Sequence, residues 1–233
     1  MTWVDVTIDE VVQETPLDRS FVLRVPREHR AAFAFTPGQY LRLRDPRDAD
    51  AREWYFSLSG APNDDGTLRV TVRGRGDAVQ GIYAGRVGST WQSVPPAGDF
   101  EFDTDPHERI VLAGAGSGVT PFRALLEQQA NTGSQRSIWL LHSARSADEL
   151  LFHADFETWS AAGAAFTYRP TITGEDAAWT GRKGRIDAVL LQEALGEGAA
   201  AVRLFACGPG PFVDAVFAQA AALGLAPERC CRQ

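Results

Sequence analysis

The spacing of apolar residues divides the chain into two halves with different patterns. In the first half, short segments alternate apolar and polar positions and are separated by turn residues such as Pro37-Gly38. Four such segments are 4–8, 21–25, 40–44 and 68–73. Several short alternating segments at this spacing predict a small antiparallel β-barrel, with one helical segment over 79–84.

From about Pro106 onward, buried strands alternate with amphipathic helices. We expect strands over 109–113, 137–142, 165–170 and 202–207, and helices over 120–129, 149–161, 186–195 and 211–222. This alternation predicts a doubly wound parallel sheet with helices on both faces. The predicted architecture is therefore a two-domain protein, with a β-barrel over 1–104 and an α/β domain over 105–233.

Composition narrows the function classes. The net charge of −7 argues against general nucleic-acid binding. The longest apolar runs are too short to span a membrane, and the first residues do not form an export signal. The three cysteines fit a reducing cytoplasm. Their spacing matches neither an iron–sulfur nor a zinc site, so we expect no metal.

The chain is organised around a glycine-rich turn at 110–121. Four apolar residues lead into glycines at alternate positions, Gly114, Gly116 and Gly118, and Thr120-Pro121 then open a helix. Glycines let backbone N–H groups approach a ligand, and a helix N-terminus favours an anion such as a pyrophosphate. A plain strand–turn–helix is the alternative, because this spacing is not the usual G-x-G-x-x-G fingerprint.

A second turn of the same kind lies near the C-terminus, where a buried strand ends in Cys207-Gly208-Pro209-Gly210. In doubly wound sheets, ligands bind beyond the carboxyl ends of the strands. Both turns should therefore lie on one edge and flank one crevice. The alternative is that Cys207 is only a small buried residue.

Two stretches of the barrel half could hold a flat ring and a phosphate. An aromatic strand at 52–59 ends in small hydroxyl residues, which suits ring stacking and hydrogen bonding but also a core strand. The glycine-containing loop at 74–81 could wrap a phosphate or be an ordinary loop.

Taken together, these motifs resemble the ferredoxin–NADP reductase superfamily over nearly the whole chain. The matching segments, in the family's order, are Pro37–Tyr40, Phe56–Ser59, 96–100, Gly114–Pro121, Ser143–Arg145, Thr180–Ile186 and Cys207–Pro209. The segment at 96–100 resembles the strand that closes the family's barrel.

The resemblance implies specific site residues. Those expected to contact the flavin are Arg52, Trp54, Tyr55, Phe56, Ser57, Leu58, Ser59, Val72, Arg73, Gly76, Ala78, Val79 and Gln80. Those expected to contact the nicotinamide nucleotide are Gly114, Gly116, Ser117, Gly118, Thr120, Pro121, Ser143, Arg145, Cys207, Gly208, Pro209, Gly210 and Phe212. Ser59 would lie near the flavin edge, and Thr120 and Cys207 would border the nicotinamide.

The chain departs from the family's flavin motif. The family's phosphate-binding Arg falls on Trp54, its Tyr on Phe56, and its loop Ser or Thr near Gln80. Arg52 has the strand parity of Trp54 and lies about 6.6 Å further along, so it could replace the missing Arg. A local bulge could instead bring Tyr55 to the position of the family's Tyr.

The function implied by the resemblance is that of a flavoprotein reductase. It would carry FAD, or alternatively FMN, and use NADH or NADPH, with a slight preference for NADH. Its electrons would go to a separate ferredoxin, flavodoxin or oxygenase component. Two alternatives stay open: a reductase of free flavin, and a non-catalytic regulatory subunit that keeps the fold.

Overall fold

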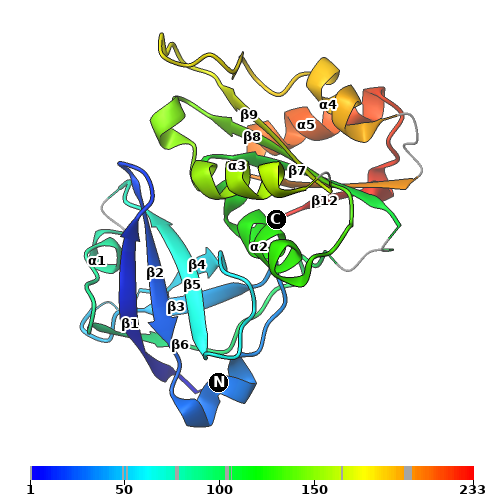
Figure 1. Cartoon of the computed structure of the whole chain (residues 1–233). Helices are drawn as coiled ribbons and strands as arrows, with labels where there is room; N and C mark the ends of the chain where they lie inside the picture. The colour runs from blue at the N-terminus through cyan, green and yellow to red at the C-terminus, as the bar shows by residue number, and fades with distance from the viewer. Residues whose placement is uncertain are drawn as a thin grey trace. The chain divides into compact units, whose positions relative to one another are not determined.

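The computed structural model describes residues 2–48, 50, 52–76, 79–102, 105, 107–163, 165–196 and 201–233. The chain divides into two compact units (Figure 1). The first comprises Met1–Phe102 and Thr120–Gln128, and the second comprises Asp103–Val119 and Gln129–Gln233. The domain boundary after residue 104 stays a prediction.

The first unit is built on a six-stranded antiparallel sheet with the order β4-β3-β6-β1-β2-β5. Its strands are β1 (Val4–Gln13), β2 (Asp18–Arg24), β3 (Tyr40–Arg44), β4 (Trp54–Ser57), β5 (Thr67–Arg73) and β6 (Thr90–Ser93). An antiparallel bridge between Leu58 and Val70 joins the chain after β4 to β5, the strand at the other edge. The sheet therefore closes into the predicted barrel.

Alternating apolar residues fill the barrel, because successive side chains of a strand point to opposite faces. Val6 and Ile8 of β1 and Leu23 of β2 are fully buried. Phe21 packs against Trp91 with ring centroids 4.9 Å apart. This unit also contains two short helices, the 3-10 helix η1 (Arg27–Phe33) and α1 (Gln80–Tyr83). The second confirms the helical segment predicted over 79–84.

The closing strand predicted over 96–100 is wrong. In this segment only Ala97 makes a β-bridge, which pairs it with Tyr40 of β3. The strand that pairs with β3 along this side is the earlier β6. Pro95 and Pro96 have no N–H to donate to a ladder, which explains the difference. The segment nevertheless packs closely, since a Cβ on Gly38 would lie 1.7 Å from the carbonyl oxygen of Phe100.

The second unit is built on a six-stranded parallel sheet with the order β10-β9-β8-β7-β11-β12. Its strands are β7 (Arg109–Ala115), β8 (Ile138–Ala144), β9 (Phe166–Ile172), β10 (Arg182–Lys183), β11 (Val202–Cys207) and β12 (Cys230–Arg232). The four predicted parallel strands are confirmed. The edge strands β10 and β12 escaped prediction because two or three residues carry no periodic signal.

Helices cover both faces of this sheet. Helices α4 (Ala188–Leu195) and α5 (Gly210–Ala222) pack with Val111 and Leu141 in one apolar cluster. Helix α3 (His153–Ala162) packs on the other face, where the ring of Phe156 lies 5.4 Å from that of Tyr168. Helix α2 (Thr120–Thr132) follows the glycine turn. In the described part of the chain, no helix is long and apolar enough to cross a membrane.

The helix predicted over 149–161 begins later than expected. A short 3-10 turn, η4 (Ala147–Glu149), precedes it, and α3 starts only at His153. Phe152 adopts a left-handed φ of 61°, which interrupts the helix between the two. Leu150, Leu151 and Phe152 are buried, so packing of this turn outweighs their helical spacing.

Candidate active site

The two glycine turns of the second unit leave the same edge of the parallel sheet. Strands β7 and β11 are neighbours, and Gly114 pairs with Cys207 at their carboxyl ends. On the other side of β7, Ala115 pairs with Ser143 at the end of β8. Three segments expected to hold the nucleotide therefore converge at the edge where such sheets bind ligands.

Gly118 brings the two turns into backbone contact. A Cβ on this residue would lie 2.2 Å from the carbonyl oxygen of Cys207 and 2.8 Å from the amide nitrogen of Gly208. No side chain fits into that space, so the third glycine of the motif is required by packing. The close approach joins the turn after β7 to the turn after β11 and fixes the floor of the predicted nucleotide site.

Two other glycines of these turns have a backbone geometry that residues with a side chain rarely adopt. Gly116 has a φ of +56° and Gly208 a φ of +149°, both in the region that L-residues avoid. Gly116, Ser117 and Gly118 form a 3-10 turn, η3 (Gly116–Val119), in which Ser117 is exposed. After β11, Pro209 precedes α5, which starts with Gly210 and carries Phe212 in its first turn.

Cys207 is a neutral thiol in this setting. Burial raises the pKa of its thiol from 9.0 to about 11. The thiol donates a hydrogen bond of 3.3 Å to the side-chain oxygen of Gln233. A half-buried thiol with a raised pKa is a poor nucleophile, so a role for Cys207 would come from its small size.

Residues after β8 complete the same edge. Ser143 is buried within β8, and Arg145 is exposed just beyond the strand. The backbone carbonyl of Arg145 accepts a hydrogen bond of 2.8 Å from the amide of Gly174. This bond anchors the loop after β8 and leaves the Arg145 side chain at the surface. Its contact with a nucleotide stays a prediction.

A cluster of polar side chains formed by His142, Tyr168 and His153 escaped the sequence analysis. Nδ1 of the fully buried His142 lies 3.1 Å from the hydroxyl of Tyr168, and Nδ1 of His153 lies 3.2 Å from the same oxygen. Burial raises the pKa of Tyr168, so the hydroxyl stays protonated. No sequence signal could have revealed this cluster, because its three residues are far apart in the sequence and lie on different elements.

Strand β4 presents its alternate residues to opposite sides. Trp54 pairs with Leu43 and Phe56 with Leu41, so both aromatic side chains face the barrel core. Tyr55 pairs with Arg42 on the outer face and is 58 % exposed. The pairing is regular over these residues, so the proposed bulge is absent there. Tyr55 nevertheless offers the exposed ring of this strand.

The strand-parity argument for Arg52 is therefore wrong. The face that Trp54 and Phe56 share is the barrel core, and Arg52 precedes β4. Its guanidinium pairs at the surface with the carboxylate of Asp48, 2.8 Å away, which lowers the pKa of Asp48. Contact of Arg52 with a flavin phosphate stays a prediction that needs another physical basis.

Two further residues expected at the flavin are engaged elsewhere. Arg73 donates hydrogen bonds of 2.9 and 3.0 Å to the two carboxylate oxygens of the fully buried Asp18. Gln80 donates weakly to the carbonyl oxygens of Gly74 and Gly76, each 3.5 Å away. Val79 packs against the barrel core. Ala78 lies outside the described residues.

Ser59 is fully buried, and its hydroxyl lies inside the barrel. Its Oγ is 2.8 Å from the hydroxyl of Thr71, which lies 2.8 Å from that of Ser20. Leu58 and Val72 are also fully buried, whereas Ser57 is half-buried at the end of β4. Direct contact of the Ser59 side chain with a flavin edge stays a prediction. For that contact its hydroxyl would first have to give up the hydrogen bond to Thr71.

The residues present fit the two implied cofactors to different degrees. The backbone contact at Gly118 and the converging strand ends suit a nucleotide. The exposed ring of Tyr55 suits a flat ring. Gly76 has a φ of +90°, and a Cβ on it would meet nothing within 4 Å, so there is space for a phosphate beside this residue. The side chains fit the flavin phosphate less well, because the position of the family's phosphate-binding Arg is taken by Trp54, which lies in the barrel core. Among the described residues no three potential metal ligands gather together.

Comparison with known proteins agrees with this arrangement. Residues 112–217 match the family model of the oxidoreductase NAD-binding domain. The ferredoxin reductase component of 3-ketosteroid-9-alpha-monooxygenase from Rhodococcus rhodochrous is 30% identical over 91% of the chain, which spans 59% of that relative. Ferredoxin–NADP reductase B from Sorangium cellulosum is 27% identical over 83% of the chain and 82% of its own length.

Solved structures share the whole fold. The ferredoxin–NADP⁺ reductase from Neisseria gonorrhoeae, solved with FAD and NADP, superposes with a TM-score of 0.85 at 21% identity, covering 100% of this chain and 98% of that one. The flavohaem-like FAD/NAD-binding domain from Vibrio cholerae superposes with a TM-score of 0.83 at 24% identity, covering 99% and 97%. The NAD-binding family model, the curated relatives and the barrel-plus-parallel-sheet fold agree with one another, and they make the chain similar to flavoprotein reductases of the ferredoxin–NADP reductase type.

Proposed function

We propose that the protein is an NAD(P)H-dependent flavoprotein reductase that delivers electrons to a separate electron carrier or oxygenase component. The observation that supports the proposal is the close approach of Gly118 to the backbone of Cys207 and Gly208 at the carboxyl edge of the sheet, where parallel sheets bind ligands. One relative is named as the ferredoxin reductase component of a monooxygenase and two as electron transfer components of dioxygenases, and these names support the type of acceptor.

FAD is the proposed flavin, and FMN the alternative. The chemistry that a bound flavin supplies is acceptance of a hydride and release of electrons one or two at a time. Tyr55 would stack on its ring from the outer face of β4, and backbone groups near Gly76 would meet its phosphate. In the second unit, Gly114, Gly116 and Gly118 would hold the pyrophosphate of the nicotinamide nucleotide, and Cys207 would leave room for the nicotinamide.

NADH is the proposed electron donor in preference to NADPH. Arg182 pairs with Asp187, and the exposed Arg145 is followed by Asp148, so acidic groups compete for the cations that could bind a 2′-phosphate. A kcat/KM ratio above about ten in favour of NADPH would overturn this choice, since that ratio is about 1.4 kcal/mol of transition-state preference.

A reductase of free flavin is the second candidate, and one observation favours it. Trp54 lies in the core where the family places an Arg, and Arg73 is occupied by Asp18, so two potential phosphate contacts are lost. Flavin would then bind and leave as a substrate. A non-catalytic subunit is the third possibility.

The cytoplasm is the proposed compartment because the three cysteines are free thiols.

Purification and reconstitution separate these candidates. Protein that keeps FAD through gel filtration and reduces an added one-electron acceptor with NADH supports the proposal. Protein that consumes NADH only in proportion to added free flavin is a free-flavin reductase. Protein that binds neither flavin nor NADH, although folded by circular dichroism, has no reductase function.

A further inference from the structure

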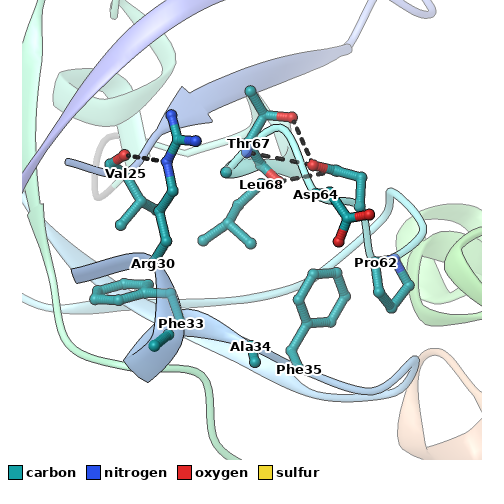
Figure 2. Close-up of a pocket in the computed structure, with 12 residues that line it drawn as sticks. Val25, Arg30, Phe33, Ala34, Phe35, Pro62, Asp64, Thr67 and Leu68 are labelled. Carbon is teal, nitrogen blue, oxygen red and sulfur yellow. Dashed lines mark hydrogen bonds between the residues drawn. The ribbon is translucent and has the colours of Figure 1, made fainter. Parts of the chain in front are cut away.

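The barrel unit contains a pocket that the proposed reductase function does not use. It has a volume of about 450 Å³ and lies between η1 and the chain that leads into β5 (Figure 2). Its walls come from residues 25–35 on one side and 62–68 on the other. A cavity of this size is in the range that holds small organic ligands.

The floor of the pocket is apolar. Phe33 and Leu68 belong to the buried core of the barrel, and Phe35 packs against that core while staying partly exposed. Pro62 adds a further apolar surface on the opposite wall. An apolar body placed here would leave water and cover the exposed parts of Phe35 and Pro62, which is favourable.

Arg30 lies at one side of the pocket, in space that is free because residue 66 is a glycine. Its Nε donates to the carbonyl oxygen of Val25 over 3.5 Å. A Cβ on Gly66 would lie 2.2 Å from that Nε and 2.7 Å from the central guanidinium carbon, so any other residue there would displace the guanidinium. Gly66 also has a φ of +73°, which favours glycine independently.

The charge of Arg30 is not neutralised by a neighbouring carboxylate in the described part of the chain. Several other arginines of the barrel unit are ion-paired, such as Arg73 with Asp18 and Arg47 with Asp45. Asp64 is the acidic residue of the pocket, and Figure 2 shows it on the side opposite Arg30. The pocket therefore presents one cation and one anion across an apolar floor.

The wall that carries Asp64 is held in shape by Asn63. Its side-chain oxygen accepts hydrogen bonds from the amides of Asp65 and Thr67, and its side-chain nitrogen donates to the carbonyl oxygens of Ala61 and Thr67. Such a preformed wall reduces the entropy that a ligand would lose in ordering the loop.

We propose that this pocket binds a small organic monocarboxylate with an apolar body. The carboxylate would accept two parallel hydrogen bonds from the Arg30 guanidinium, a geometry that matches arginine well. The apolar body would lie on Phe33, Phe35 and Leu68. Asp64 disfavours a second negative charge at the far wall, so a dicarboxylate or a phosphate monoester would bind more weakly than a monocarboxylate.

Titration of the full-length protein with 4-fluorobenzoate, followed by ¹⁹F NMR, tests the proposal. A fragment of about ten heavy atoms should bind with a Kd near the millimolar range. Arg30→Gln should weaken binding by about tenfold or more, because a charge-assisted bond is lost. Arg27→Gln is the matched control, since Arg27 is an exposed residue of the same 3-10 helix and does not line the pocket.

Neutral and reversed-charge probes complete the test. We expect 4-fluorobenzyl alcohol and 4-fluorobenzylamine to bind more weakly than 4-fluorobenzoate, and Phe35→Ala to weaken binding without loss of the folded spectrum. Equal affinity of wild type and Arg30→Gln for 4-fluorobenzoate would overturn the proposal. So would equal binding of the alcohol and the acid, or no saturable binding up to about 20 mM.

Discussion

The guanidinium of Arg123 donates a hydrogen bond of 2.7 Å to the backbone carbonyl oxygen of Ser59. Arg123 is only 4 % exposed and also pairs with Glu127, 3.3 Å away, whose carboxylate accepts from the amide of Ala61 over 2.6 Å. The first half of α2 is thereby bound to the chain that follows β4. Both belong to the first unit, although α2 continues directly from the nucleotide turn.

Arg123→Ala should destabilise the protein by about 2–3 kcal/mol, because a buried charged hydrogen bond is lost and Glu127 loses its cationic partner. The exposed Arg52–Asp48 pair is a suitable control, and Arg52→Ala should change the stability little, because water screens this pair. Urea unfolding of the three proteins without cofactor measures both values. Equal losses for the two variants would show that burial of Arg123 adds nothing.

Tyr55 and Phe56 should respond differently to truncation. Tyr55→Ala removes an exposed ring and should weaken flavin binding by up to about tenfold, the worth of an aromatic stacking pair, with unchanged stability. Phe56→Ala removes a ring that packs on the core and should cost about 2–4 kcal/mol of stability. Flavin titration and urea unfolding report the two effects. Loss of flavin affinity in Phe56→Ala alone, at full stability, would contradict the assignment of faces.

Arg52 can be tested as a phosphate ligand through its acidic partner. If Arg52 leaves Asp48 to meet the flavin phosphate, Arg52→Ala should weaken flavin binding about tenfold to a hundredfold. Asp48→Asn should then tighten it, because the competing carboxylate is removed. Flavin dissociation constants measured by fluorescence quenching show whether Arg52 contacts the phosphate. Identical constants in all three proteins would leave Arg52 as a surface charge.

Cys207 should be nearly inert to alkylation. Because its pKa is raised from 9.0 to about 11, its thiolate fraction at pH 8 is about a hundredth of that in the unfolded chain, so iodoacetamide should label it far more slowly. Between pH 9 and about 11 the unfolded chain gives up this proton first, so the contribution of the thiol to stability falls as pH rises. Mass spectrometry of native and urea-unfolded protein measures the labelling ratio. A ratio near one would place Cys207 at the open surface.

Much of the fold was predictable because strong patterns coincide with the central strands. The buried runs ending at Ala113 and Cys207 and the glycines after them specify parallel strands and turns. What the sequence could not specify depends on tertiary contacts. The alternation of Trp54, Tyr55 and Phe56 predicts two faces, but only the pairing with Leu43, Arg42 and Leu41 shows which face is the core.

The same reason explains the site residues that behave differently from expectation. Arg73 and Ser59 have side chains typical of ligand binding, and their partners Asp18 and Thr71 lie on other parts of the barrel. No local pattern in the sequence reveals that these polar groups satisfy one another. By contrast, Gly118 was identified from its motif alone, and the structure supplies the reason in its contact with Cys207.

Anaerobic stopped-flow mixing of the FAD-reconstituted protein with NADH is the decisive test of the proposed reductase function. A flavoprotein reductase should lose its flavin absorbance at a rate that saturates with NADH. Cys207→Trp should retain bound FAD and be reduced at least about a hundredfold more slowly, a barrier increase of about 2.7 kcal/mol. Reconstituted protein that is not reduced by either NADH or NADPH, or a Cys207→Trp variant that is reduced at the wild-type rate, would contradict this function and this placement of the nicotinamide.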